Sequence, residues 1–227
     1  MTAQLPLALR LREGFDLDSY AGPPGLAEAV KALVSGEWGQ VYLHGAPGTG
    51  RTHLLTAAVR LAEGLGQSAC LLPGEEMAHL TPDVLEAFEQ FDLVAVDNVD
   101  ALAGLPDWEE ALFHLYNRCR EAQGRLLFAA LAPPAAAGFA LPDLASRLGA
   151  GPVYRLTVPD DAALAALLQR RARHRGLVLG EEVAAYVVQR GERTPAALMQ
   201  LLEALDEHAL ARQRRLTIPF VKEVLGW

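Results

Sequence analysis

Short apolar runs alternate with helical patterns over the first two thirds of the chain. The runs occupy residues 40–43, 68–73, 93–97, 126–131 and 153–158. They are almost continuously apolar, which predicts strands that are buried on both faces. Helical patterns lie between them at residues 51–66, 82–91 and 107–124. This alternation predicts an α/β fold in which a parallel five-stranded sheet lies between helices.

The pattern changes after Val158, where no further strand-like run occurs. Three or four helical patterns follow, at residues 160–176, 180–191, 194–214 and 217–227, with glycines and prolines at their boundaries. We therefore expect an N-terminal segment at 1–14, an α/β domain at 15–158 and a small all-α domain at 159–227.

Composition narrows the class of protein. The chain has 227 residues, of which 51% are hydrophobic and 21% charged, as in folded proteins. Its net charge of −8 argues against general affinity for nucleic acid or anionic membranes. The two cysteines, Cys70 and Cys119, lack C-x-x-C spacing and are expected to be buried free thiols. No apolar stretch approaches the ~18 residues of a membrane span, so we expect a cytoplasmic protein.

The stretch HGAPGTGRTH, residues 44–53, nearly matches the phosphate-binding pattern G-x-x-x-x-G-K-[ST]. It follows a predicted strand and begins a predicted helix, so its backbone N–H groups can face a phosphate. A glycine-rich turn without a ligand is the alternative. The expected nucleotide-binding residues are Gly45, Pro47, Gly48, Thr49, Gly50, Arg51, Thr52 and His53.

Arg51 occupies the position where this pattern has lysine. Arginine keeps the positive charge but is bulkier than an ammonium group, so nucleotide binding should survive the change better than catalysis. Only Lys31 and Lys222 are lysine among the 20 basic residues, so compositional drift explains the substitution equally well.

Asp97 ends the apolar run 93–97, at the position from which P-loop proteins hold magnesium. A carboxylate at an ordinary turn is the alternative. Many P-loop ATPases carry a second acidic residue next to it, which polarises the attacking water. Here that residue is Asn98, whose amide cannot accept a proton.

Several stretches resemble a known family: WEEALFHLYNR (108–118), LPDLASRL (141–148), LTIPFVKEVL (216–225) and the arginine-bearing phosphate loop. The chain resembles the AAA+ domain of the replication initiator DnaA and, more closely, the Hda family of regulatory inactivators of DnaA. The resemblance implies an AAA+ P-loop NTPase core followed by a helical lid domain.

The resemblance also implies a clamp-binding peptide within residues 1–14. Gln4, Leu5, Leu7 and Leu9 match the Q-L-x-L-x-L peptide by which Hda-like proteins attach to the sliding clamp of DNA polymerase. An extended peptide with alternate leucines suits an apolar groove. Taken alone, the same residues form an apolar terminus that is frayed or docks on its own core.

By the same resemblance, Arg147 is an arginine finger that acts in trans on the ATP of DnaA. A solvated or salt-bridged arginine is the commoner role for such a position. The basic run 170–175 could contact DNA, but a solvated helix face explains it better.

The chain departs from the family at its nucleotide sensors. Ala129, Ala130 and Leu131 stand where a small polar sensor is expected, and Ala196 stands where the sensor arginine of the lid belongs. Arg193 lies one turn earlier and either replaces that arginine or is a surface residue. With Asn98, these changes favour bound ADP over ATP, with Mg²⁺ held by Asp97 if a metal is bound.

The resemblance implies a negative regulator of replication initiation. With the DNA-loaded clamp it would promote hydrolysis of DnaA-bound ATP, while its own ATPase is weak. Its partners would be DnaA and the clamp, and it would contact DNA mainly through the clamp. A homodimer is possible, and no contact with a membrane is expected. The alternatives are a self-sufficient AAA+ ATPase or DnaA paralogue, and a replication adaptor without an activating role.

Overall fold

A computed structural model describes residues 15–17, 20–212 and 214–227. The predicted clamp-binding residues Gln4, Leu5, Leu7 and Leu9 lie outside the described residues. Among the described helices, none combines the length and the apolar character that crossing a bilayer requires.

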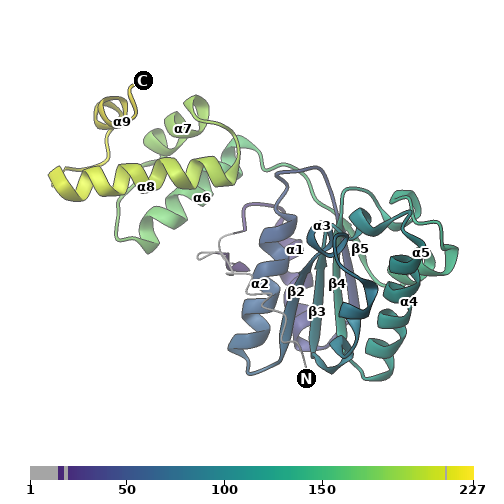
Figure 1. Ribbon diagram of the computed structural model, residues 1–227. Coiled ribbons are helices and arrows are strands. Elements are labelled where there is room, and N and C mark those ends of the chain that lie inside the picture. The colour runs from purple at the N-terminus through teal and green to yellow at the C-terminus, as the bar shows by residue number, and fades with distance from the viewer. Residues whose placement is uncertain (1–14, 18–19, 213) are drawn as a thin grey trace. The chain divides into compact units, whose positions relative to one another are not determined.

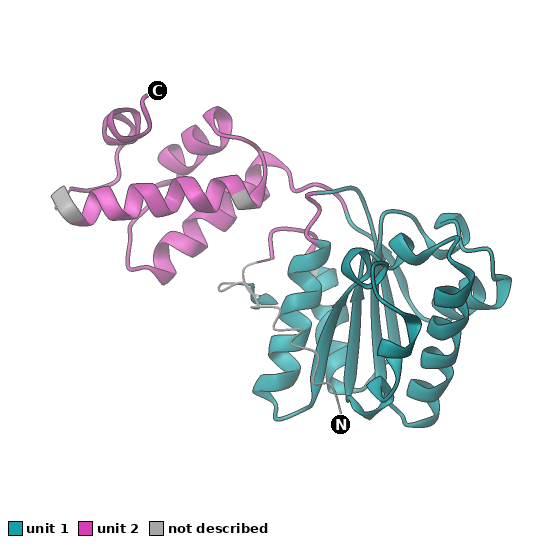
Figure 2. Ribbon diagram, in the orientation of Figure 1, with its two compact units in different colours: residues 1–18, 24–47, 51–156 teal, residues 19–23, 48–50, 157–227 magenta. Residues whose placement is uncertain are grey.

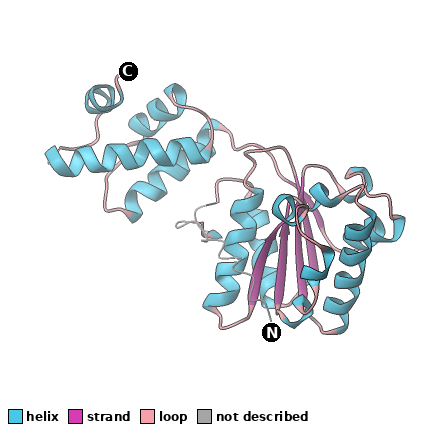
Figure 3. Cartoon of the chain, viewed as in Figure 1, coloured by secondary structure: helices cyan, strands magenta, loops and turns pink. Residues whose placement is uncertain are grey.

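One parallel sheet organises the first part of the chain, as predicted (Figures 1 and 3). Its strands are β1 Gln40–His44, β2 Ala69–Pro73, β3 Leu93–Asp97, β4 Arg125–Ala130 and β5 Val153–Arg155. They lie in the order β2-β3-β4-β1-β5, and every pairing is parallel. The carboxyl ends of β1, β3 and β4 therefore meet at one edge of the sheet, where ligands bind in open α/β sheets.

Burial differs between the central and the outer strands. All of β3 and nearly all of β1 and β4 are buried. β2 is only half-buried, and Val153 in β5 is 40% exposed. The prediction of five fully buried strands is therefore wrong for the outer pair, because an edge strand has a neighbour on one side only. Strand β5 ends at Arg155, whereas the prediction placed its end at Val158.

Helices cover both faces of the sheet (Figure 1). Helices α1 Pro24–Ser35 and α2 Arg51–Gly64 lie on one side, and α4 Pro106–Glu121 and α5 Pro142–Leu148 on the other. Alternate strand residues share a core with α4 and α5: Tyr42, Leu72, Val94, Val96, Leu126, Phe128 and Ala130. Since successive strand residues point to opposite faces, the intervening residues face α1 and α2.

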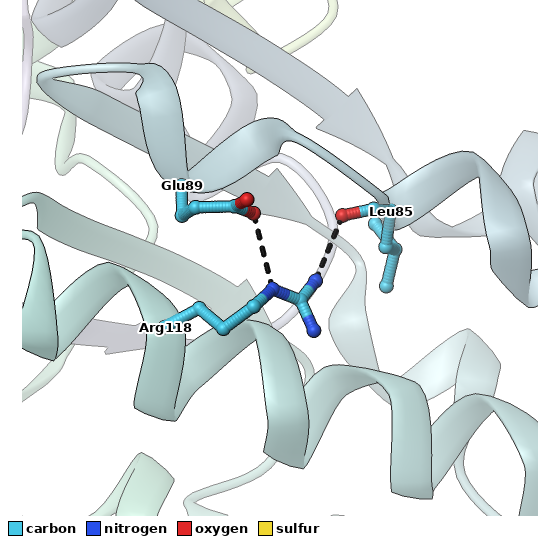
Figure 4. Close-up of polar contacts among 3 residues, drawn as sticks. All are labelled: Leu85, Glu89 and Arg118. Atoms are coloured by element: carbon cyan, nitrogen blue, oxygen red, sulfur yellow. Dashed lines mark hydrogen bonds and ion pairs between the residues drawn. The ribbon is translucent and has the colours of Figure 1, made fainter.

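The predicted helix at 82–91 is wrong. The segment forms two 3-10 turns, η2 Pro82–Leu85 and η3 Phe88–Gln90, joined through Ala87 at φ 68°. Arg118 of α4 holds both turns, because its Nε donates to Glu89 Oε2 at 3.1 Å and its Nη2 donates to Leu85 O at 3.0 Å (Figure 4). Tertiary packing thus replaces the helix that local pattern favours.

Further short elements complete this region: α3 Gly74–Met77, η4 Val99–Leu102 and η5 Pro134–Ala136. The helical pattern at 107–124 is confirmed as α4, whose Trp108, Leu112, Leu115, Tyr116 and Cys119 are buried. Pro106 stands in its first turn, where a missing N–H costs nothing.

The described residues after β5 form four helices, α6 Asp161–His174, α7 Glu181–Arg190, α8 Pro195–Arg212 and α9 Ile218–Leu225. Asp160 caps α6 by accepting from Ala163 N at 2.8 Å, and Thr217 caps α9. These helices share their own buried core, which includes Leu168, Leu198 and Phe220.

The chain divides into two compact units (Figure 2). Of the described residues, the first unit, the sheet unit, comprises 15–17, 24–47 and 51–156. The second, the helical unit, comprises 20–23, 48–50, 157–212 and 214–227. Each unit has a hydrophobic core of its own.

Candidate functional site

The glycine-rich loop joins β1 to α2 at the carboxyl edge of the sheet. It begins beside β4, because Gly45 N donates to Ala130 O at 3.1 Å. Gly48 and Gly50 adopt φ values of 81° and 93°, which residues with a side chain rarely adopt. Such a loop before a helix of 14 residues turns backbone N–H groups toward one point, as a phosphate cradle requires.

Tyr20 lies against this loop in the helical unit. A Cβ built on Gly50 would approach Tyr20 Cε2 to 2.9 Å, so a side chain there would not fit. Arg170 Nη2 donates to Tyr20 O at 3.1 Å, which fixes the tyrosine backbone. Burial raises the pKa of Tyr20 to about 12, so the phenol stays neutral. Sequence reasoning missed Tyr20, since no local pattern marks it.

Arg51 is the first residue of α2, and its Nη1 is buried with no hydrogen-bond partner in the described part of the chain. A buried donor without an acceptor costs free energy, and more so when the group is charged. A phosphate oxygen of a bound nucleotide would supply that acceptor. The arginine therefore fits the role expected of the lysine it replaces.

Thr52 and Asp97 form one polar cluster next to Arg51. Thr52 Oγ1 donates to Asp97 Oδ2 at 2.5 Å, and Asp97 Oδ1 accepts from Asn98 N at 3.0 Å. Asp97 is only 6% exposed, and this burial raises its pKa despite the hydroxyl and the nearby Arg51.

The cluster fits a magnesium ion. A carboxylate and a hydroxyl are oxygen ligands, and Mg²⁺ in nucleotide sites takes its other ligands from water and phosphates. Among the described residues, no three His, Cys, Asp or Glu side chains gather as a metal site of their own. The role of Asp97 as a magnesium ligand thus stays a prediction that the geometry fits.

Asn98 is held by a carboxylate that the sequence reasoning missed. Its Nδ2 donates to Glu75 Oε1 at 3.1 Å, and its backbone is left-handed at φ 48°. Glu75 lies in α3, directly after β2, and β2 is the neighbour of β3. The sequence did contain a signal for Glu75, because this acidic residue follows a predicted parallel strand. Asn98 stands where many P-loop ATPases have a carboxylate. Glu75 places a carboxylate directly beside that position.

Two further predicted residues have other partners. The His53 ring stacks on Phe15 with 4.7 Å between centroids, and its Nε2 is 2.8 Å from Asp16 O. Arg193 forms an ion pair with Asp161 at 3.4 Å, in which both side chains are more than half exposed. Exposed pairs of this kind hold a side chain weakly. Nucleotide contact by His53 and Arg193 stays a prediction.

The predicted sensor position at the end of β4 is apolar, since Ala129 and Ala130 are buried and carry no polar group. The basic run 170–175 has partners within the helical unit. Besides the bond from Arg170 to Tyr20, Arg173 Nε donates to Gln169 O at 3.4 Å and Arg175 pairs with Asp206 at 3.6 Å. This favours a structural and solvated role for the run.

Arg147 lies near the end of α5 with its side chain exposed. Its guanidinium carbon is 5.8 Å from the centre of the Tyr116 ring, within the range of a cation–π contact. Within the described part of the chain, Arg147 forms no ion pair. Its charge is therefore available to a group outside this chain.

Comparison with known families and structures gives one family match and three similar solved structures. Residues 160–225 match the family model described as Hda, lid domain. The replication initiator DnaA bound to AMPPCP and single-stranded DNA is 20% identical with a TM-score of 0.73, over 90% of this chain and 69% of that one. Domain III of Thermotoga maritima DnaA is 17% identical with a TM-score of 0.71, over 95% and 97%.

A third solved structure, Thermotoga maritima RuvB with the substitution T158V, is 17% identical with a TM-score of 0.72, over 95% of this chain and 72% of that one. At these identities the likeness shows the fold, which is that of AAA+ proteins. The match at 160–225 covers α6 to α9, so these helices are similar to the Hda lid domain.

Proposed function

We propose that this chain is an Hda-like, DnaA-related AAA+ replication protein, which promotes hydrolysis of ATP bound to DnaA and thereby restrains replication initiation; the lid match and the shared fold support this. In this proposal the chain acts as an activator of another protein's ATPase. Its own nucleotide holds the AAA+ core together, and the reaction takes place in the site of DnaA.

The observation that carries the proposal is the state of Arg147. Its guanidinium is exposed, forms no ion pair among the described residues and lies on a helix packed against the core. An arginine supplied by a neighbouring protein stabilises the charge of the transferring phosphoryl group, which is worth ~10³–10⁵ in rate. Such a group must be both rigidly held and free to reach outward.

The nucleotide site supports a holding role. Arg51 Nη1 lacks an acceptor that a phosphate would provide, and Thr52 with Asp97 offers oxygen ligands to Mg²⁺. The polar groups that would drive turnover are reduced, because Asn98 replaces a carboxylate and Ala130 replaces a polar sensor. We therefore propose bound ADP, with ATP as the alternative.

The clamp and DNA enter the proposal through the sequence. Gln4, Leu5, Leu7 and Leu9 would bind an apolar groove of the sliding clamp. DNA would be reached mainly through that clamp, in keeping with the net charge of −8. A head-to-tail contact with DnaA would place Arg147 at the ATP of DnaA.

The experiment measures hydrolysis of DnaA-bound ATP in the presence of the sliding clamp loaded on DNA. We expect the native protein to stimulate hydrolysis, and Gln4→Ala and Arg147→Ala each to lose most of that stimulation. No stimulation by the native protein would refute the proposal. Stimulation that survives Arg147→Ala would refute the role of Arg147 alone.

An intrinsic ATPase is the second candidate, and the carboxylate of Glu75 beside Asn98 is the observation that favours it. Hydrolysis by the isolated protein at ordinary ATPase rates, lost in Glu75→Gln, would establish it. The neighbouring Glu76→Gln is the matched control, since Glu76 lies in the same short helix. We expect slow hydrolysis, and ADP as the nucleotide extracted from the purified protein.

A further inference from the structure

Helix α5 is too short to fix the position of Arg147 by itself. It has seven residues, and isolated helices shorter than ~12–15 residues are marginal in water. Its geometry must therefore come from groups outside the helix. Two buried polar side chains contact its two ends, and in the described part of the chain their hydrogen bonds go to backbone groups outside the nucleotide loop.

Glu109 of α4 holds the beginning of α5. Its Oε1 accepts from Gly104 N at 2.7 Å and from Ala140 N at 3.0 Å, and its Oε2 accepts from Leu141 N at 2.6 Å. Leu141 is the residue that immediately precedes the helix. One carboxylate thus ties the start of α5 to the turn before α4.

The carboxylate of Glu109 is buried, with 2% of the residue exposed. Burial alone raises the pKa of Glu109, but the three N–H donors outweigh it, so the pKa lies below its usual range. The group is therefore charged at neutral pH, and hydrogen bonds to an ionised acceptor are the strong ones. Removing the charge would leave three N–H groups poorly satisfied.

Gln40 of β1 holds the end of the same helix. Its Nε2 donates to Arg147 O at 3.0 Å and to Leu148 O at 2.7 Å. Carbonyls in the last turn of a helix have no partner within the helix, so an external donor is needed there. Gln40 is 4% exposed, and it bonds directly to the backbone of Arg147.

The face of α4 supports the rest of α5. Glu109, Leu112 and Tyr116 are spaced by three and four residues, which places them on one side of α4. Leu144 and Leu148 of α5 are fully buried in the core shared with α4. The Tyr116 ring lies under the Arg147 guanidinium at the end of this face.

We propose that Glu109 and Gln40 are positioning residues for Arg147, which fix the two ends of α5 so that the guanidinium is presented in one orientation. The inference rests on the proposed function, because Arg147 must act on the ATP of DnaA for its orientation to affect a rate.

The test compares Glu109→Gln with Glu110→Gln in clamp-dependent hydrolysis of DnaA-bound ATP. Glu110 is the adjacent residue, and its carboxylate is exposed beside His114 at 3.6 Å. We expect Glu109→Gln to lower the maximal stimulated rate by about tenfold to a hundredfold, since small misplacements of a catalytic group have effects of that size. The concentration of this protein that gives half-maximal stimulation should change by less than about twofold, because the substitution leaves its binding to DnaA unchanged.

Gln40→Leu is the second variant, and it decides the test if Glu109→Gln does not fold. Gln67→Leu is its control, since Gln67 Nε2 makes only a long contact with Val34 O at 3.5 Å. Both positioning variants are also placed in the Arg147→Ala background. There we expect no further loss, because residues that act through Arg147 have nothing left to position.

Each outcome has one meaning. Native maximal rates in Glu109→Gln and Gln40→Leu, or further losses added to Arg147→Ala, would overturn the positioning role and leave the proposed function intact. A rise in the half-maximal concentration that accounts for the whole effect would also overturn it. Failure of the native protein to stimulate DnaA would refute the proposed function, and the positioning role with it.

Discussion

The glycine-rich loop and helix α5 each depend on a buried charged group, Arg51 and Glu109, and the two groups have opposite surroundings. At the loop, Arg51 Nη1 is buried without an acceptor among the described residues, and burial raises the pKa of Asp97. At α5, Glu109 and Gln40 are buried and bonded to backbone groups, and the pKa of Glu109 is lowered. The first region is incomplete without a ligand. In the second, the Glu109 carboxylate accepts three hydrogen bonds from backbone N–H groups, and Arg147 on α5 is exposed.

In the proposed function, these two environments allow one chain to hold a nucleotide and to act on another protein. Unsatisfied charged groups favour binding of a ligand that satisfies them, here a nucleotide with its phosphates and Mg²⁺. A buried carboxylate with three N–H donors, as at Glu109, gives rigidity, which is what an arginine acting in trans requires. The following predictions change one region at a time.

The largest effect is expected at Arg147. We expect Arg147→Ala to reduce the stimulated hydrolysis of DnaA-bound ATP by about a thousandfold or more. Arg147→Lys should recover only a small part, because an ammonium lacks the planar fork of donors. Arg190→Ala is the control, since Arg190 also lies over a tyrosine ring, at 5.9 Å from Tyr186. Equal losses in Arg147→Ala and Arg190→Ala would argue against a specific role.

The next effect is expected at Arg51. Removing its charge-assisted hydrogen bond to phosphate should weaken ADP binding by about tenfold to a hundredfold, as 1.5–3 kcal/mol implies. We expect this in Arg51→Met, measured by titration calorimetry, while Arg51→Lys retains most of the affinity. The ligand-free protein should not lose stability in Arg51→Met, because a buried donor without an acceptor is removed. Unchanged ADP affinity would show that Arg51 does not contact phosphate.

Gly50 should be sensitive for a steric reason. Gly50→Ala places a side chain at φ 93° and within 2.9 Å of Tyr20, so we expect a loss of about 1–3 kcal/mol in the free energy of unfolding. Urea unfolding measures it. Gly64→Ala is the matched control, because Gly64 ends α2 with open space around it and should be neutral or slightly stabilising. A neutral Gly50→Ala would contradict the described loop conformation.

The smallest effects are changes in stability with pH, and they should have opposite signs in the two regions. The folded pKa of Asp97 is raised, so its contribution to stability is lost as pH rises from the ordinary Asp pKa through the folded value. The folded pKa of Glu109 is lowered, so its contribution is present above the ordinary Glu pKa and is lost as pH falls through the folded value.

Urea unfolding between pH 4 and pH 7 tests this contrast. Relative to the native protein, Asp97→Asn should be at least as stable near neutral pH, and its advantage should shrink toward acid. Glu109→Gln should be less stable near neutral pH, and its deficit should shrink toward acid. The same sign of pH dependence in both variants would contradict the assigned environments.

The sequence predicted correctly those helices and strands whose burial in the fold matches their pattern of apolar residues. The central strands and α4 follow directly from apolar runs and helical spacing. The segment 82–91 failed because Arg118 bonds to Leu85 O and Glu89, and no window of local sequence contains that contact. β5 was predicted to be buried, but its position at the sheet edge is a property of the topology.

Some residues of the candidate site could likewise be predicted from the sequence and others could not. The loop residues and Asp97 were found because their spacing is itself the signal. Glu109 and Gln40 were missed because their partners are backbone groups, most of them distant in sequence, 107 positions in the case of Gln40 and Arg147. Backbone acceptors and donors leave no residue-type signature. Only the three-dimensional arrangement reveals that these two side chains hold one helix.

The most direct test follows the label of the hydrolysed nucleotide. DnaA is loaded with γ-labelled ATP and this protein with unlabelled ADP, and release of labelled phosphate is followed on DNA carrying the sliding clamp. We predict rapid release with the native protein and with Arg51→Lys, and slow release with Arg147→Ala. Release that is as fast with Arg147→Ala as with the native protein would contradict the claim that this chain acts on the ATP of DnaA through that arginine.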